Sequence, residues 1–190
     1  MEMEERPKRR ARKGPGRVIR AFLFSDIVGS TEILNRFIRR WGQHQGNEQF
    51  REAILRPHDE RLEKCIEAHE GEVVSTAGDS YFVTFKDARR AIECAVAFQR
   101  SLLADPIPIP LAGGDLPKHL QVRIGLHAGA ATAVSRAGQP NYQDETINIA
   151  HRIQEHAEGE QILTSKETWL KQGKSRVSER VNGLGTASRG

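Results

Sequence analysis

The pattern of apolar and polar positions predicts buried strands and amphipathic helices in the first part of the chain. Residues 18–28 form an apolar, β-branched and aromatic run, which is typical of a buried strand. Residues 29–32 break this run and offer a helix N-cap, so we expect a helix toward Arg40. Over residues 47–69, apolar side chains recur at helical spacing, which predicts a long amphipathic helix that bends or restarts at Pro57.

The rest of the pattern alternates strands with helices. Strands are expected at 72–77 and 81–85 around a Gly78-Asp79-Ser80 hairpin turn, and again at 122–128, 130–134 and 161–164. Helices are expected at 87–103, 146–157 and 165–172, with a loop over 104–118 and a polar segment over 135–143. A mid-chain hairpin with helices between the other strands predicts an α+β fold. Its plan is ferredoxin-like and derived from βαββαβ, with a central, mostly antiparallel sheet and helices packed against it.

Length and composition favour a single soluble domain. The chain has 190 residues, of which 37% are apolar, so it can bury an ordinary core. No apolar run approaches the roughly 20 residues needed to cross a bilayer, and no apolar stretch follows the basic N-terminus as in a secretory signal. Cys65 and Cys94 lie inside apolar-periodic stretches, which indicates core packing in a reducing compartment. We therefore expect a cytoplasmic protein.

Positive charge is concentrated at the N-terminus. The first 20 residues hold eight basic and three acidic residues, whereas the whole chain has a net charge of +4. We expect a disordered basic tail over 1–16, a catalytic domain over 17–174 and a poorly ordered or truncated segment over 175–190. A basic tail can touch nucleic acid or an anionic membrane, but no aromatics are interleaved for base stacking. The composition therefore favours a solvated leader over a nucleic-acid partner.

Asp26 is the first residue with candidate chemistry. It stands at the end of the apolar strand over 18–28, where an unpaired buried carboxylate would be costly. A hard cation there would make use of it, since carboxylate oxygens bind such ions. A helix cap or a salt-bridge partner remains an alternative. Gly29, Ser30 and Thr31 follow, and the first N–H groups of the next helix would face outward toward phosphate oxygens.

Asp79 is the second candidate. Gly-Asp in a turn is usually only a turn. However, if the hairpin pairs beside the first strand, Asp79 lies next to Asp26. Two carboxylates at neighbouring strand ends form a site for two Mg²⁺ or Mn²⁺ ions, which can lower the pKa of an attacking hydroxyl and neutralise a leaving pyrophosphate.

Asn148 and Arg152 form the third candidate. They are four residues apart and therefore share one face of the expected helix, with Ile147, Ala150 and Ile153 on its buried side. The pair could be solvated decoration. It could instead fix a ribose and stabilise charge on a transferring phosphoryl group.

Taken together, these segments resemble the class III adenylyl/guanylyl cyclase catalytic domain. Four blocks match in order over roughly residues 18–172: FLFSDIVGST, GEVVSTAGDSYFVTF, VRIGLHAGAA and INIAHRI, followed by EGEQILTS. The resemblance implies that Asp26 and Asp79 are metal ligands, and that Ile27 and the backbone through Thr31 contact metal and phosphate. It also implies that Asn148 orients the ribose and Arg152 stabilises the transition state.

The same resemblance implies a homodimer, in which one subunit supplies the aspartates and the other supplies Asn148 and Arg152. The reaction would be attack of the ribose 3′-hydroxyl on the α-phosphate of a nucleoside triphosphate. It would release pyrophosphate and a 3′,5′-cyclic monophosphate.

The positions that contact the base depart from the family pattern. Ser75 stands where typical adenylyl cyclases have a lysine, and Asn141 where aspartate or threonine is common. Because serine and asparagine can each donate and accept, they select no single base. ATP, GTP and a pyrimidine triphosphate all remain open. The compact layout resembles bacterial members that make cyclic UMP or cyclic CMP in phage defence.

Two other functions compete with a nucleotidyl cyclase. A diguanylate cyclase would also set acidic metal ligands at a strand and a hairpin, but its Gly-Gly-Asp/Glu-Glu-Phe turn is replaced here by Ala77-Gly78-Asp79-Ser80-Tyr81. A non-catalytic homologue that binds nucleotide or regulates a partner would explain the altered base positions. Against it, both aspartates and the asparagine–arginine pair are present.

Overall fold

The computed structural model describes residues 16–114, 116–136 and 139–171. The expected tail over 1–16 and the expected C-terminal segment over 175–190 lie outside these ranges, apart from Gly16, which opens the first strand. The elements occur in this order: β1 Gly16–Ile27, α1 Ser30–Trp41, α2 Gln43–Phe50, a π-helical turn Arg51–Leu55, α3 Arg56–Ala68, β2 Glu72–Ala77, β3 Ser80–Phe85, α4 Ala88–Ala104, β4 Val122–Arg136, β5 Gln139–Gln143, α5 Glu145–Glu155, β6 Ile162–Thr164 and α6 Lys166–Lys171.

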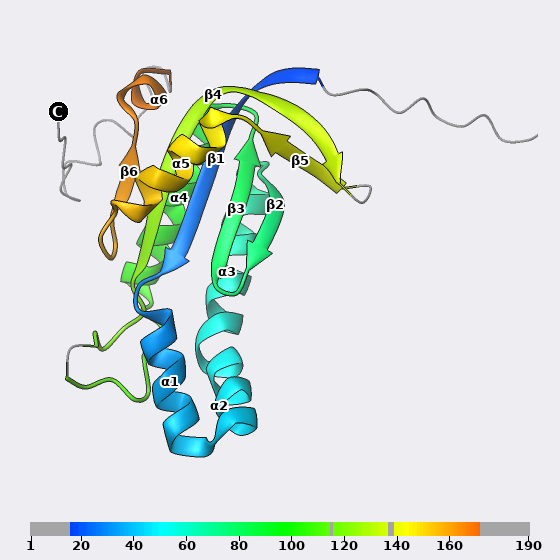
Figure 1. Cartoon of the computed structure of the whole chain (residues 1–190). Helices are drawn as coiled ribbons and strands as arrows, with labels where there is room; N and C mark the ends of the chain where they lie inside the picture. Colours follow the sequence, from blue (N-terminus) through cyan, green and yellow to red (C-terminus); the bar gives the residue numbers. More distant parts are fainter. Residues whose placement is uncertain (1–15, 115, 137–138, 172–190) are drawn as a thin grey trace, which may run out of the picture.

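One sheet organises the molecule, with strand order β2-β3-β1-β4-β5 and β6 beside β4 (Figure 1). All pairings are antiparallel except that of β6 with β4. β1 and β4 pair along the whole of β1, from Gly16 opposite Ala133 to Ile27 opposite Val122. The predicted α+β fold with a mostly antiparallel sheet is confirmed, and so is the pairing of the hairpin with the first strand.

Alternation along β1 divides the core between the two faces of the sheet. Leu23 and Ile27 are buried in the main core with residues of α1, α3 and α4. Phe22 and Phe24 belong to a smaller cluster on the opposite face with Ala150 of α5. Figure 1 shows α5 in front of β4 and β1, with α4 behind the sheet. Since Asp26 continues the register of Phe22 and Phe24, it lies on the α5 face.

Two glycines of β4 let α5 lie close to the sheet. A Cβ on Gly125 would come within 2.2 Å of the backbone nitrogen of Gln154, and a Cβ on Gly129 within 2.9 Å of the Thr146 side chain. Any larger residue at Gly125 would therefore push the helix backbone away. The position of Asn148 and Arg152 thus depends on a missing side chain in the neighbouring strand.

The prediction of two strands at 122–128 and 130–134 is wrong, because β4 runs unbroken from Val122 to Arg136. Ala128-Gly129-Ala130 suggests a break, but the small residues serve close packing instead. The prediction of a polar connecting segment over 135–143 is also wrong in part, since Gln139–Gln143 forms β5 and pairs with the C-terminal end of β4. As a strand at the end of the sheet order, β5 needs no apolar alternation.

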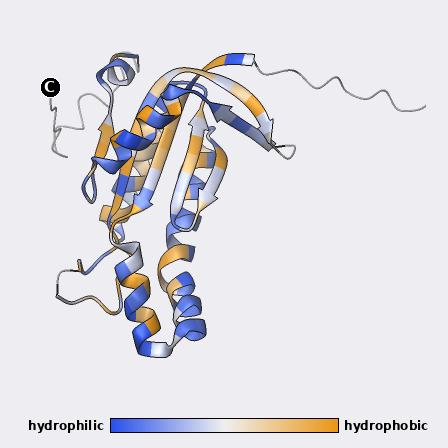
Figure 2. Ribbon diagram, viewed as in Figure 1, coloured by the Kyte–Doolittle hydropathy of each residue, from blue (hydrophilic) through white to orange (hydrophobic). Residues whose placement is uncertain are grey.

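The long helix expected over 47–69 is confirmed as a helical stretch with an irregularity just before Pro57. A π-helical turn at Arg51–Leu55 separates α2 from α3. α1 and α2 extend beyond the end of the sheet, and Figure 2 shows hydrophobic and hydrophilic residues mixed along both helices. Gly46 packs directly on α1, since a Cβ there would be 2.6 Å from the Cα of Ile38.

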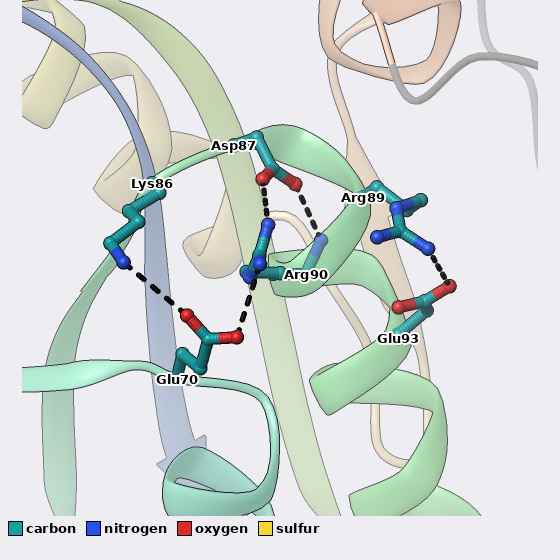
Figure 3. A network of polar contacts seen from close by, with 6 residues as sticks. All are labelled: Glu70, Lys86, Asp87, Arg89, Arg90 and Glu93. Carbon is teal, nitrogen blue, oxygen red and sulfur yellow. Dashed lines mark hydrogen bonds and ion pairs between the residues drawn. The ribbon is translucent and has the colours of Figure 1, made fainter.

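A surface network of charges ties the α3–β2 turn to the start of α4 (Figure 3). Arg90 contacts both Glu70 and Asp87, and Lys86 also pairs with Glu70. The Asp87 side chain accepts a hydrogen bond from the backbone nitrogen of Arg90 at 3.0 Å, which caps α4. This network fixes the end of the helix that covers the far face of the sheet.

Both cysteines are free thiols that belong to the core, as predicted: Cys94 is buried and Cys65 is half-buried against it. Within the described residues, the structure has no helix with the length and apolar character that a membrane span requires.

Candidate active site

The two predicted metal aspartates lie side by side at one end of the sheet. Ser25 of β1 pairs with Tyr81 of β3, which brings the β2–β3 turn to the end of β1. The Asp79 Oδ2 accepts a hydrogen bond from the backbone nitrogen of Ile27 at 3.0 Å, and the Ser80 hydroxyl donates to Asp26 Oδ1 at 2.7 Å. Asp79 is thus bound by Ile27, the residue after Asp26, and Asp26 is bound by Ser80, the residue after Asp79.

The turn geometry explains why glycine precedes Asp79. Gly78 has a φ of +63°, in the left-handed region that L side chains rarely adopt. The sharp reversal allows Asp79 to reach back to Ile27. The Ile27 side chain is buried in the core, so only its backbone can take part in the site.

Negative charge accumulates at this pair. Burial raises the pKa of Asp79, and the neighbouring Asp26 carboxylate raises it further, while hydrogen bonds from Ile27 and Ser30 oppose the shift. Two adjacent carboxylates with oxygen ligands suit a hard divalent cation, and Mg²⁺ is commonly held by one or two carboxylates plus substrate phosphates. The residues present therefore fit the predicted Mg²⁺ or Mn²⁺ site.

Arg123 is a site residue that the sequence reasoning missed. It stands opposite Asp26 in the β1–β4 register, and its guanidinium donates to Asp26 Oδ2 from Nη2 at 2.6 Å and from Nε at 3.1 Å. The signal was a single basic residue near the start of an otherwise apolar strand. The guanidinium supplies positive charge to the aspartate pair.

The predicted phosphate-binding residues follow directly after the aspartate strand. Gly29 has a φ of +71° and stands at the N-cap of α1 without a side-chain cap. The first N–H groups of a helix have no partner within the helix. Ser30 and Thr31 open α1, and both side chains have solvent access. This loop can present backbone donors to an anion beside Asp79.

Asn148 and Arg152 lie on the exposed side of α5, as predicted, while Ala150 is buried beneath them. Asn148 Nδ2 donates to Glu145 Oε2 at 3.3 Å, and Arg152 Nη1 lies 3.5 Å from Glu145 Oε1. Asn148 and Arg152 therefore share Glu145 as a partner, and among the described residues neither has a polar contact with the two aspartates.

Ser75 and Asn141, the predicted base-contacting residues, lie on different strands. Ser75 is exposed on β2 opposite Phe82, next to a register shift after Val73. Asn141 is on β5, and its Oδ1 accepts a hydrogen bond from the backbone nitrogen of Tyr142 at 2.7 Å. No polar contact between the two is present in the part of the chain that the structure describes.

An aromatic cluster covers the α5 face of the sheet between these positions. Phe24 and Phe82 stack with ring centroids 4.5 Å apart, and Tyr142 meets Phe22 edge-on at 5.3 Å. His151 of α5 meets Phe24 edge-on at 5.2 Å. Flat aromatic surface near the aspartates is chemically suited to a nucleobase.

Solved structures share this architecture. The adenylyl cyclase CyaB from P. aeruginosa superposes with a TM-score of 0.65 and 22% identity, over 83% of this chain and 82% of that chain. A non-canonical dimeric guanylyl cyclase domain of the RhoGC fusion protein from Blastocladiella emersonii gives a TM-score of 0.64 and 22% identity, over 82% of this chain and 84% of that chain. The fold is therefore that of nucleotidyl cyclase domains.

The sequence places the chain within that group. It matches the adenylate and guanylate cyclase catalytic domain over residues 19–183. It is also 27% identical over 163 residues to an adenylate cyclase of Mycosarcoma maydis, a match over 77% of this chain. The chain belongs to the adenylate and guanylate cyclase catalytic domain family, class III. It spans 6% and 13% of the lengths of the curated relatives it matches.

Proposed function

We propose that the chain converts a nucleoside triphosphate to its 3′,5′-cyclic monophosphate and pyrophosphate. The observation that carries this proposal is the joining of Asp26 and Asp79 by the reciprocal bonds of Ser80 and Ile27. The two carboxylates would hold two Mg²⁺ or Mn²⁺ ions. When bound, these ions lower the pKa of the attacking 3′-hydroxyl and neutralise charge on the leaving pyrophosphate.

The chain's own groups would bind and orient the triphosphate. The backbone donors of Gly29, Ser30 and Thr31 would bind its phosphate oxygens. The guanidinium of Arg123 stands beside Asp26, where it would add positive charge next to the reacting phosphate. Pre-placed charges of this kind stabilise a transition state because they need no reorganisation during the reaction.

A homodimer would complete the site. Asn148 and Arg152 are exposed and have only Glu145 as a polar side-chain partner among the described residues, so they are free to reach a neighbouring subunit. From the partner subunit, Asn148 would orient the ribose and Arg152 would stabilise the pentavalent phosphorus. The guanylyl cyclase domain of RhoGC is described as a non-canonical dimer, so it supports dimerisation of a domain with this fold and leaves the arrangement of the two subunits to the experiment below.

Complementation tests the shared site. Asp26→Ala and Arg152→Ala proteins should each be inactive, because each homodimer lacks one half of both sites. Mixing them in equal amounts creates heterodimers with one intact site, so about a quarter of wild-type activity should return if exchange is random. Dimers that exchange subunits and remain inactive would refute the shared arrangement.

The base that is cyclised is the finer part of the proposal. Because Asn141 Oδ1 is engaged by Tyr142, its Nδ2 is the group most available to a base, and it would donate to an acceptor such as a carbonyl oxygen. This orientation is compatible with UTP or CTP as well as ATP or GTP. With a pyrimidine substrate, the product would be cyclic UMP or cyclic CMP, with a role in antiviral signalling.

Direct assay separates these substrates. The purified protein is incubated with each of the four ribonucleoside triphosphates and Mn²⁺, and the products are identified by mass spectrometry. A cyclic product from one of them identifies the base. The absence of cyclic product from all four, with nucleotide binding retained, would favour a non-catalytic homologue that binds nucleotide or regulates a partner.

A further inference from the structure

We propose that the substrate's triphosphate tail extends into a cavity beside Asp79, and that Arg51 binds its terminal phosphate together with a metal ion. This inference rests on the proposed cyclase function and adds to it a phosphate-binding residue from the π-helical turn. Neither the aspartate strand nor α5 contributes that residue. The resemblance to cyclases did not single it out.

The cavity begins at the proposed phosphate site. It has a volume of about 620 Å³, within the usual range of roughly 300–1,000 Å³ for small-molecule sites. One wall is formed by Ser30, Thr31 and Asp79, which are the predicted phosphate and metal residues. A phosphate chain bound at the start of α1 therefore has this space directly beside it.

The lining residues from α2 and the π-helical turn carry the complementary charge. Arg51 lines the cavity and is exposed, and no ion pair or hydrogen bond of its side chain occurs among the described residues. Its neighbour in sequence, Glu52, pairs instead with Arg56 at 2.9 Å. A free guanidinium can bind two phosphate oxygens at once, in a geometry that lysine does not offer. His44 also lines the cavity and adds a second nitrogen donor.

Two acidic residues of the lining, Glu48 and Asp79, determine which kind of anion the cavity can bind. Glu48 lines the cavity one turn before Arg51, and Asp79 lines it as well. A bare anion would meet repulsion from these carboxylates. A phosphate that carries a divalent cation brings its own positive charge, so a metal–triphosphate chain suits the mixture of Arg51, Glu48 and Asp79 better than free phosphate does.

The apolar residues of the lining strengthen the attraction between Arg51 and a phosphate. Leu34, Phe50 and Leu55 supply apolar surface to the lining, and Phe50 is buried. Apolar surroundings lower the local dielectric constant and strengthen attraction between a guanidinium and a phosphate. The close contact of Gly46 with the Ile38 backbone holds α2 against α1 and so fixes the distance between the lining residues of the two helices.

The π-helical turn sets the direction of Arg51. This residue is the first of the turn at Arg51–Leu55, where the regular helical ladder is interrupted before Pro57. An extra residue in a helical turn rotates the following side chains relative to the preceding ones. Such turns often occur at functional sites. The irregularity therefore has a use beyond accommodating the proline.

The test compares Arg51→Ala with Arg56→Ala in the 190-residue chain. Arg56 lies outside the cavity, is exposed and pairs with Glu52, so it is a matched control on the same helical stretch. Losing a charge-assisted bond should raise both the KM for the nucleoside triphosphate and the inhibition constant of inorganic pyrophosphate about tenfold or more. Arg56→Ala should leave both constants unchanged. Arg51→Lys keeps the charge and should give an intermediate value.

A binding experiment separates this inference from the proposed function. Calorimetry with Mn²⁺ and inorganic tripolyphosphate needs no turnover, and Arg51→Ala should weaken this binding about tenfold. If the wild type makes no cyclic product but tripolyphosphate binding still depends on Arg51, the cavity assignment stands and the cyclase proposal fails. If the wild type is active and the Arg51 variants match it in KM and binding, the cavity assignment is overturned.

Discussion

The contact between Gly125 and α5 can be tested by adding one methyl group. In Gly125→Ala, the new Cβ would lie 2.2 Å from the backbone nitrogen of Gln154, whereas ordinary contact begins at 3.4 Å. The shortfall is about 1.2 Å. It cannot be relieved by rotating a side chain, because the opposing atoms are backbone. The helix itself must move away from β4 by about that distance.

This displacement has two measurable effects. Overpacking of this kind costs about 1–3 kcal/mol, which lowers the melting temperature of a domain this size by roughly 2–12 °C. Because α5 carries Asn148 and Arg152, a shift of about 1 Å should also reduce kcat by about 100-fold. Cyclic-nucleotide production is measured below the melting temperature of the variant. Calorimetric Mn²⁺ binding should persist, since Asp26 and Asp79 lie on other elements.

Two further glycine variants calibrate the result. In Gly129→Ala, the Cβ would meet the Thr146 side chain at 2.9 Å. That side chain can rotate, although it would lose its 2.6 Å bond to the carbonyl of Ala130, so a smaller loss is expected. Gly16→Ala meets nothing within 4 Å and should behave as wild type. Wild-type stability and turnover in Gly125→Ala would refute the argument that this glycine sets the position of α5.

Three further predictions concern other parts of the molecule. Asp87→Ala should cost about 1 kcal/mol through loss of the α4 cap. Burial raises the pKa of Asp87, but its bonds with Arg90 outweigh burial and hold the pKa below its usual value. The melting-temperature difference between Asp87→Ala and wild type should therefore be full above about pH 4, and it should vanish as pH falls through that lowered pKa. Burial raises the pKa of the Cys94 thiol to about 12, so iodoacetamide at pH 7 should label Cys94 only after unfolding. Labelling of Cys94 in the folded protein as fast as in the unfolded protein would contradict this. In the wild type, the Arg123 guanidinium competes with metal for Asp26, so Arg123→Ala should bind Mn²⁺ alone more tightly by calorimetry. The variant should nevertheless turn over more slowly, because it lacks the positive charge beside the reacting phosphate. Unchanged Mn²⁺ affinity would argue against the competition.

Much of the fold could be predicted because periodicity is strong where one face of an element is buried. The strand ending near Asp26 and the hairpin around Asp79 follow directly from apolar alternation and turn residues. The continuity of β4 could not be predicted, since Gly129 reads as a break when its packing partner, Thr146, is unknown. β5 escaped prediction because a polar strand that pairs on one side only carries little hydrophobic signal.

In the site, the closeness of the two aspartates could be predicted, whereas the contribution of Arg123 could not. Proximity of Asp26 and Asp79 followed from the assumption that the hairpin pairs with the first strand, and that pairing is confirmed. Arg123 was missed because its importance depends on register: only the pairing of β1 with β4 shows that it faces Asp26. A sequence pattern gives the face of a strand, but it does not give the residue opposite.

The partnership of Arg123 with Asp26 also bears on how the protein matures. Many small metal-binding domains remain unfolded until their ion arrives, because the free energy of metal binding supplies their folding free energy. Here the Arg123 guanidinium donates to Asp26 Oδ2, the Ser80 hydroxyl donates to Asp26 Oδ1, and the backbone nitrogen of Ile27 donates to Asp79 Oδ2. The protein's own groups thus offset part of the negative charge of the pair, and we expect the chain to fold without a metal ion. We therefore expect a chelator to stop the proposed cyclase reaction without lowering the melting temperature of the protein.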